Sequence, residues 1–184
     1  MNQKKKLYGK ILLPTALAAA LLSLTACGSG DSNNASTIAR ITNESSAVST
    51  VNGEVPYTFF DDAVFVGDSV SLKLNLYVSA QRKNDNAFMG TARFLTPGSY
   101  GTGNELKELG SDNSVHPSYN GTEMYLADAI EAMGAKKVFI MLGMNDIAVY
   151  GNDGAVKNME TVLAQIKEKN PDTTIYVQSM TPIV

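Results

Sequence analysis

Four short apolar runs predict strands in the later two thirds of the chain. They lie at 63–66, 92–96, 137–142 and 174–179. Uninterrupted runs such as Ala63-Val64-Phe65-Val66 suit strands that are buried on both faces of a parallel sheet. Turn residues border each run, so we expect four separate strands rather than one long apolar segment.

Helical spacing of apolar residues fills the intervals between these strands. The first helix is predicted from Ser69, with Val70, Leu74 and Tyr77 on its buried side. Further helices are predicted at 104–109, at 122–133 and at 155–169. Strands that alternate with helices imply βαβ units with right-handed crossovers. The pattern therefore predicts an α/β fold, a three-layer α/β/α sandwich around a mostly parallel sheet.

The first 26 residues have the pattern of a secretory signal peptide. Four lysines precede an apolar stretch at 11–24, which is shorter than the roughly 20 residues that a spanning helix needs. The stretch ends in Leu24-Thr25-Ala26-Cys27, which resembles the bacterial lipobox, in which the cysteine is diacylated. Two acyl chains suffice for stable anchoring. The alternative is an ordinary signal peptide with a chance cysteine.

Residues 27–56 are predicted to form a flexible tether between Cys27 and the folded domain. The segment is rich in Ser, Thr, Asn and Gly and has few large apolar residues to bury. An alternative is that 38–48 contributes an edge strand. The domain itself is predicted at 57–184. Because no helix follows the last strand, we expect this α/β domain to be incomplete at its C-terminal end.

Composition and charge exclude several kinds of site and partner. A single Cys excludes an intramolecular disulfide and a zinc site made of cysteines. Removing residues 1–26 leaves 11 basic residues against 18 acidic ones, a net charge of −7. This balance argues against nucleic acid as a partner, because phosphate binding needs a basic face. Neither a cofactor nor a metal is expected.

Three polar or glycine-rich segments follow predicted strands. They are Gly67-Asp68-Ser69, the loop from Gly98 to Gly103, and Gly143-Met144-Asn145-Asp146. In open α/β sheets, ligands bind beyond the carboxyl ends of the strands. A Ser in the first turn of a helix also has a free backbone N–H beside its hydroxyl. Taken singly, each segment has an ordinary alternative: a helix cap, a flexible loop or a turn.

Together, the three segments resemble the blocks of the SGNH (GDSL-like) hydrolases, a family of serine esterases. The resemblance covers about 63–184 and implies a flavodoxin-like fold and ester hydrolysis through an acyl-enzyme. It implies that Ser69 is the nucleophile, that Asn145 donates its amide to the oxyanion, and that Gly101 donates its backbone N–H, with Gly98 as the fallback. The supporting residues would be Gly67, Asp68, Gly143 and Asp146, the two aspartates bracing their loops.

The fourth block of that family, Asp-x-x-His, has no match here. Asp172 is followed by Thr173, Thr174 and Ile175, and the one His of the chain, His116, lies in a loop elsewhere. A loop His beside Pro117 is expected to be exposed or locally hydrogen-bonded rather than catalytic. Without its base, a serine nucleophile is poorly activated. We therefore expect these 184 residues alone to be nearly inactive.

Three hypotheses about function remain. The first is a surface-anchored esterase that acts on glycan O-acetyl groups, lysophospholipids or short acyl esters. The second is a non-catalytic lipoprotein that binds a glycan, or a phosphate at the N-terminus of the helix that begins at Ser69. The third is a metal-dependent phosphohydrolase that uses Asp68 or Asp146, although metal sites usually gather more carboxylates.

Overall fold

The computed structural model describes residues 54–180. The predicted signal peptide, the lipidation site Cys27, most of the tether and the alternative edge strand at 38–48 lie outside these residues. Within the described part of the chain, no helix has both the length and the apolar character needed to cross a membrane.

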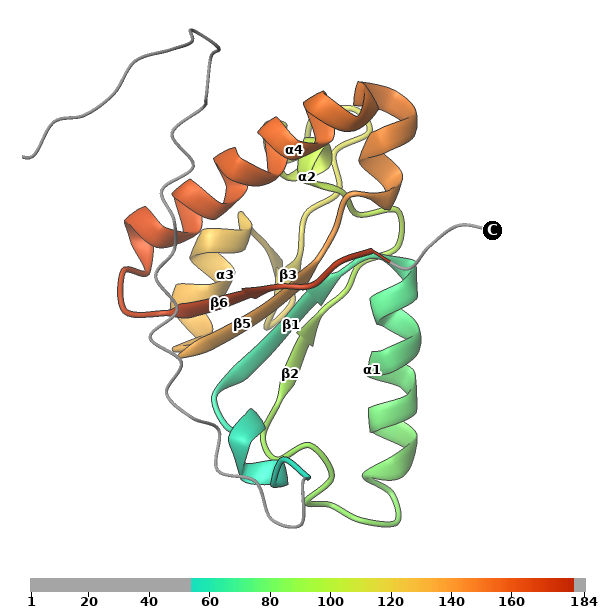
Figure 1. Ribbon diagram of the computed structural model, residues 1–184, viewed down its shortest axis with the longest axis vertical. Coiled ribbons are helices and arrows are strands. Elements are labelled where there is room, and N and C mark those ends of the chain that lie inside the picture. The colour runs from blue at the N-terminus through green and yellow to red at the C-terminus, as the bar shows by residue number, and fades with distance from the viewer. Residues whose placement is uncertain (1–53, 181–184) are drawn as a thin grey trace, which may run out of the picture. The chain divides into compact units, whose positions relative to one another are not determined.

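The described residues form a parallel α/β sheet with helices on both sides (Figure 1). Four strands make up the sheet: β1 (Ala63–Gly67), β2 (Arg93–Leu95), β5 (Lys137–Met141) and β6 (Thr174–Val177). Their order is β2-β1-β5-β6 and every neighbouring pair is parallel. The helices are α1 (Ser69–Gln81), α2 (Thr102–Glu105), α3 (Leu126–Met133) and α4 (Met144–Lys169), with a 3-10 turn at Tyr57–Phe60. The predicted fold class is confirmed.

The two faces of the sheet carry different side chains. One face buries aliphatic residues such as Val64 and Ile140 against α3 and α4, where Ile130 and Ile166 are fully buried. The other face carries a row of aromatic rings across all four strands, in which Phe65 stacks on Phe139 at 4.7 Å between centroids. The period of two residues along each strand separates these two faces.

Helix α1 differs from its predicted orientation. Leu74 and Tyr77 are exposed by 37 % and 54 %, whereas Ser71 and Val78 are buried. At the start of the helix Ser71 lies against Gly67, where an added Cβ would come within 1.9 Å of its Oγ, and the buried side of α1 runs through Ser71 and Val78. The side of α1 that carries Leu74 and Tyr77 is therefore not its buried side.

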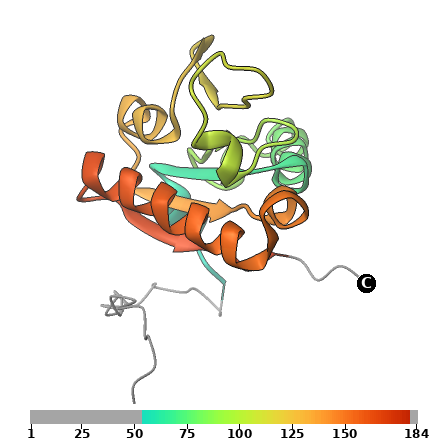
Figure 2. The same ribbon diagram turned by 90° about the horizontal axis from the view of Figure 1, so that it is seen from above.

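The helix predicted at 122–133 begins later than expected. Ser118–Tyr119 (β3) and Thr122–Glu123 (β4) instead form an antiparallel hairpin, which stands apart from the main sheet in Figure 2. Asn120 and Gly121 connect the two strands with φ of 50° and 79°. Asn-Gly with two positive φ angles is a strong hairpin signal, and it outweighs the helical spacing that begins at Thr122.

Two further boundaries differ from the sequence prediction. The short helix is α2, at Thr102–Glu105, rather than 104–109. Helix α4 begins at Met144, directly after β5, and contains a non-helical residue at Gly151 with φ of 66°. The predicted helix at 155–169 is thus the part of α4 that follows this kink.

Candidate active site

The three segments singled out in the sequence leave the sheet at the same end. Gly67 pairs with Met141 and Val66 pairs with Leu95, so β1, β5 and β2 end side by side. Neighbouring parallel strands lie about 4.8 Å apart. Helices α1 and α4 both begin at this end of the sheet (Figure 1). Topology therefore gathers the Ser69, Gly101 and Asn145 segments around one edge.

Ser69 is the first residue of α1 and is exposed to solvent. The preceding residue, Asp68, is buried and caps the helix: its Oδ1 accepts the Val70 N–H at 2.8 Å. No acceptor for the backbone N–H of Ser69 is found among residues 54–180. An accessible hydroxyl and an unpaired N–H therefore stand together at the start of the helix.

Gly67 makes this tight entry into α1 possible. A Cβ at this position would lie 1.9 Å from Ser71 Oγ and 3.0 Å from the Met141 carbonyl oxygen. The contact with Met141 involves backbone, which cannot move aside as a flexible side chain can. Gly67 therefore allows the first turn of α1 to lie close to the ends of β1 and β5.

The glycine loop is held by Asp146, which comes from the start of α4. Both carboxylate oxygens of this fully buried side chain accept backbone hydrogen bonds, from Thr102 N at 2.9 Å and from Gly103 N at 2.7 Å. A Cβ on Gly101 would lie 2.9–3.1 Å from the same carboxylate, whereas one on Gly98 would meet nothing within 4 Å. Of the two predicted glycines, Gly101 is the one that packs against the Gly-Met-Asn-Asp segment.

Asn145 contacts the same loop. Its Nδ2 donates to the Tyr100 carbonyl oxygen at 2.8 Å. That carbonyl and the Gly101 N–H belong to one peptide unit, and in a trans peptide they point in opposite directions. Asn145 therefore fixes the direction of the Gly101 N–H, which points away from the amide. No acceptor for this N–H lies in the described part of the chain, although Gly101 is buried.

The engagement of the two aspartates bears on the metal hypothesis. Asp68 accepts a helix-capping N–H, and both oxygens of Asp146 accept N–H groups of the glycine loop. Both oxygens of Asp146 are thus engaged and Asp68 keeps one, whereas a divalent cation takes several oxygen ligands. Within residues 54–180, no group of three His, Cys, Asp or Glu side chains is placed to hold an ion.

A buried polar cluster lies behind the glycine loop, and the sequence reasoning missed it. Glu105 accepts from the Tyr100 hydroxyl at 2.8 Å, and His116 Nδ1 lies 3.3 Å from the same carboxylate oxygen. All three side chains are almost completely buried. Burial raises the pKa of Tyr100 well above its usual value and also raises the pKa of Glu105. No local pattern marks Glu105, because its partners are distant in the sequence or hidden in loops.

An apolar groove of about 410 Å³ borders the candidate site. It runs between α4 and the end of β6, and Leu142 and Met180 line both this groove and the small crevice beside Asp68 and Val70. Its walls include Ile147, Ala155, Val156, Met159 and Val177. The groove thus lies next to the segment that carries Asn145.

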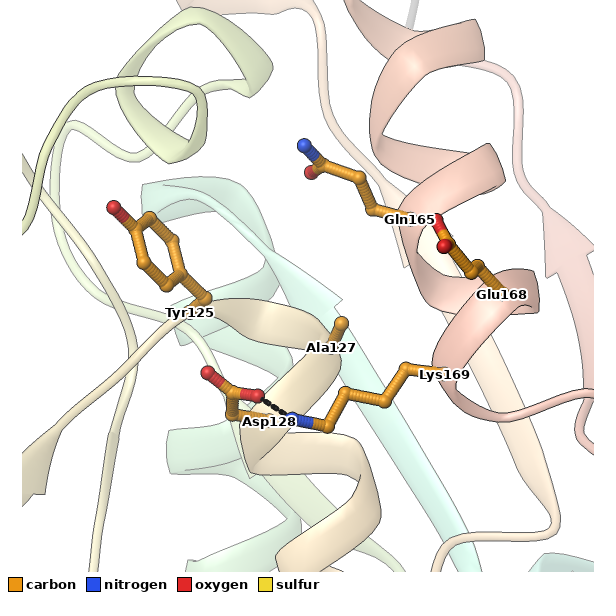
Figure 3. A pocket seen from close by; sticks show the side chains of 6 residues that line it. All are labelled: Tyr125, Ala127, Asp128, Gln165, Glu168 and Lys169. Carbon is orange, nitrogen blue, oxygen red and sulfur yellow. Dashed lines mark hydrogen bonds and ion pairs between the residues drawn. The ribbon is translucent and has the colours of Figure 1, made fainter.

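A second hollow of about 410 Å³ lies between α3 and the far end of α4, and Figure 3 shows the side chains that line it. Its lining is polar in part, and an ion pair joins Asp128 to Lys169 across it. None of the predicted site residues belongs to this hollow. It is therefore separate from the candidate active site.

Comparison with known proteins gives little further guidance. No protein-family model matches this chain, and no curated protein matches it. A solved structure that resembles it is the periplasmic domain of the Salmonella ser. Paratyphi A lipopolysaccharide acetyltransferase, with a TM-score of 0.43 and 18 % identity. The match covers 66 % of this chain and 45 % of that chain, so less than half of the matched structure is represented. A similarity of this size supports no argument about function.

Proposed function

We propose that this protein is an SGNH-type serine hydrolase that cleaves carboxylic esters through an acyl-enzyme on Ser69. One observation carries the proposal. Asn145 and Asp146 hold the peptides on both sides of Gly101 at the carboxyl end of the sheet, where Ser69 is exposed, and the Gly101 N–H has no acceptor among residues 54–180. Backbone N–H groups in folded proteins nearly always pair with protein, water or a ligand. An anionic oxygen of a bound ester would satisfy this one.

The reaction assigns a role to each group. Ser69 Oγ attacks the ester carbonyl, and its hydroxyl proton goes to a base and then to the departing alcohol. The carbonyl oxygen becomes an oxyanion, to which the backbone N–H groups of Ser69 and Gly101 donate. Asn145 orients the Gly101 peptide by donating to the Tyr100 carbonyl oxygen, so its role here is positioning rather than the direct donation to the oxyanion that the family resemblance implies. Water then attacks the acyl-enzyme, releasing the acid and restoring Ser69.

We assign no base within the described residues. His116 is the one histidine of the sequence, and it faces Glu105 instead of Ser69. The general base of the proposed reaction is therefore not assigned to any of residues 54–180.

The apolar groove beside Leu142 indicates the substrate class. Most of its walls are aliphatic and methionine side chains that would bury the acyl chain of an ester, with polar residues such as Asn152 and Glu160 among them. Each buried methylene contributes about 0.8 kcal/mol. Among the candidate substrates, this favours lipid-like acyl esters over glycan acetyl groups.

The test is Ser69→Ala in the full-length protein, with p-nitrophenyl acetate and p-nitrophenyl octanoate as substrates. We expect turnover to fall by at least about 1000-fold, and the wild-type protein to favour the octanoate. Ser79→Ala is the matched control, because Ser79 is exposed on the same helix. Undiminished turnover in Ser69→Ala would show that Ser69 is not the nucleophile.

A second candidate function is ligand binding without turnover. The position of His116, buried away from Ser69, favours it. The two functions differ in their response to a fluorophosphonate probe, which labels a reactive serine covalently. Labelling that Ser69→Ala abolishes supports the hydrolase. Reversible binding of octanoate or inorganic phosphate, together with the absence of labelling, supports the binding protein.

We also propose that the protein is anchored outside the cytoplasm through a diacylated Cys27, which the lipobox-like Leu24-Thr25-Ala26-Cys27 supports. Metabolic labelling with a clickable palmitate analogue in the native host tests this proposal. Cys27→Ala should remove the label and release the protein from the membrane fraction. A label that persists in Cys27→Ala would contradict the anchor.

A further inference from the structure

Glu105 joins three segments inside the protein. One oxygen, Oε2, accepts from the Tyr100 hydroxyl at 2.8 Å and lies 3.3 Å from His116 Nδ1. The other, Oε1, accepts the Leu126 N–H at 2.6 Å at the start of α3. The carboxyl group at the end of α2 thus connects the glycine loop, the segment before β3 and helix α3.

Burying this polar cluster in the protein interior costs free energy. A carboxyl group that is 2 % exposed loses its hydration, and burial raises the pKa of Glu105. Well-packed apolar residues of similar volume often stabilise a protein more than a buried polar network does. His116 Nε2 is also buried without a partner among the described residues. Stability alone therefore does not account for this arrangement.

Tyr100 links the cluster to the candidate site. It immediately precedes Gly101 and is held at both ends: Glu105 accepts from its hydroxyl, and Asn145 donates to its carbonyl oxygen. The ring between these two points is rigid and fully buried. The peptide that carries the Gly101 N–H is therefore fixed from the side of the protein interior as well as from α4.

We infer that Glu105, acting through the Tyr100 hydroxyl, is a positioning residue for the Gly101 N–H. The catalytic consequence of this inference rests on the proposed function. A hydrogen-bond donor stabilises an oxyanion only if it already points at the place where the charge develops. Because Glu105 lies behind the loop, it does this without touching the substrate. Displacements of about 1 Å in such groups lower rates by on the order of 100-fold.

Three variants of the full-length protein test the role. Glu105→Ala removes the anchor, Tyr100→Phe removes only the hydroxyl, and Glu105→Gln keeps the shape, since both the Tyr100 hydroxyl and His116 Nδ1 can reverse their hydrogen-bonding roles. Val162→Ala is the control, because Val162 is fully buried in α4 within the aliphatic core. It lowers stability and removes none of the cluster's hydrogen bonds.

With p-nitrophenyl octanoate, we expect kcat to fall by on the order of 10- to 100-fold in Glu105→Ala and about 5-fold in Tyr100→Phe, with KM nearly unchanged. Glu105→Gln should recover most of kcat. Val162→Ala should keep kcat within about twofold at a comparable loss of thermal stability. If Val162→Ala lowers kcat as much as Glu105→Ala does, the effect is general destabilisation and the inference is wrong.

A measurement that needs no turnover separates this inference from the proposed function. Amide hydrogen exchange of Gly101, Thr102 and Gly103, followed by NMR, should accelerate about tenfold or more in Glu105→Ala and Tyr100→Phe but not in Val162→Ala. Unchanged exchange overturns the positioning role, whatever the kinetics show. Faster exchange in a protein that has no Ser69-dependent turnover supports the positioning of the loop and refutes the hydrolase.

Discussion

The two halves of the candidate site are built in opposite ways. The glycine loop is held by three side chains, Asn145, Asp146 and, through Tyr100, Glu105, two of which are buried carboxylates. Ser69 is exposed, and within residues 54–180 its turn is held by one side-chain hydrogen bond, from the Val70 N–H to Asp68. Donors to a developing charge must be fixed in advance, whereas a nucleophile must be reachable. The contrast is what the proposed chemistry requires.

The largest effect should come from removing the charge at the centre of the loop anchor. Asp146→Asn places an amide where two backbone N–H groups need an acceptor, so we expect a loss of about 3 kcal/mol in the free energy of unfolding. Urea denaturation measures it. Asp153→Asn, an exposed change on the same helix, should stay within about 0.5 kcal/mol. Equal losses of unfolding free energy in the two variants would show that Asp146 does not hold the glycine loop more strongly than a surface residue would.

The next effect is a dependence of stability on pH. The pKa of Glu105 is raised by burial, so in the pH range just above its ordinary value the folded protein keeps a proton that the unfolded chain has released. Its contribution is complete below the ordinary pKa of Glu and is lost as pH rises to the raised value. Tyr100 and His116 are the titratable groups that face it.

Unfolding in urea between pH 4 and pH 8 reveals this dependence. The stability of the wild-type protein relative to Glu105→Gln should fall as pH rises, because Gln carries no titratable proton. A difference in stability that stays constant or rises with pH would mean that burial does not destabilise the ionised form of Glu105. The contribution of the cluster to stability would then be enough to explain it.

A smaller effect is expected at the other half of the site. Asp68→Ala removes the cap of α1 and should lower the free energy of unfolding by about 1 kcal/mol. Ser69→Ala, which leaves the cap in place, should change it by less than about 0.5 kcal/mol. Thermal unfolding of both variants is a direct comparison. A loss in Ser69→Ala as large as that in Asp68→Ala would show that Ser69 also has a structural role.

The smallest loss of stability is expected for an exposed carboxylate, which is the reference for the buried Asp146. Asp128 pairs with Lys169 at the surface, and this hydrogen bond raises the pKa of Lys169 (Figure 3). Exposed pairs contribute little, so Asp128→Asn should lower the free energy of unfolding by at most about 0.5 kcal/mol, and by less in high salt. A loss that approaches the one in Asp146→Asn would show that burial is not what separates the two carboxylates.

The strands of the main sheet, their parallel arrangement and the three polar segments that follow them were predictable from the sequence. Each of these follows from local signals: apolar runs, glycines, and polar residues at the ends of strands. Local reasoning failed where two local signals competed, as at Thr122, where the Asn120-Gly121 turn forms a hairpin and delays α3. It also failed at α1, whose apolar side chains Leu74 and Tyr77 are exposed.

The groups that hold the glycine loop depend on contacts between segments that are distant in the sequence. Asp146 and the N–H groups that it accepts are more than 40 residues apart, and Glu105 reaches Leu126 across 21 positions. Such contacts have no period and no fixed spacing, so no sequence pattern reports them. That the Asp146 carboxylate packs against Gly101 and not against Gly98 is likewise visible only in the structure. Local chemistry names the candidates, and packing between distant segments sets the direction in which each one points.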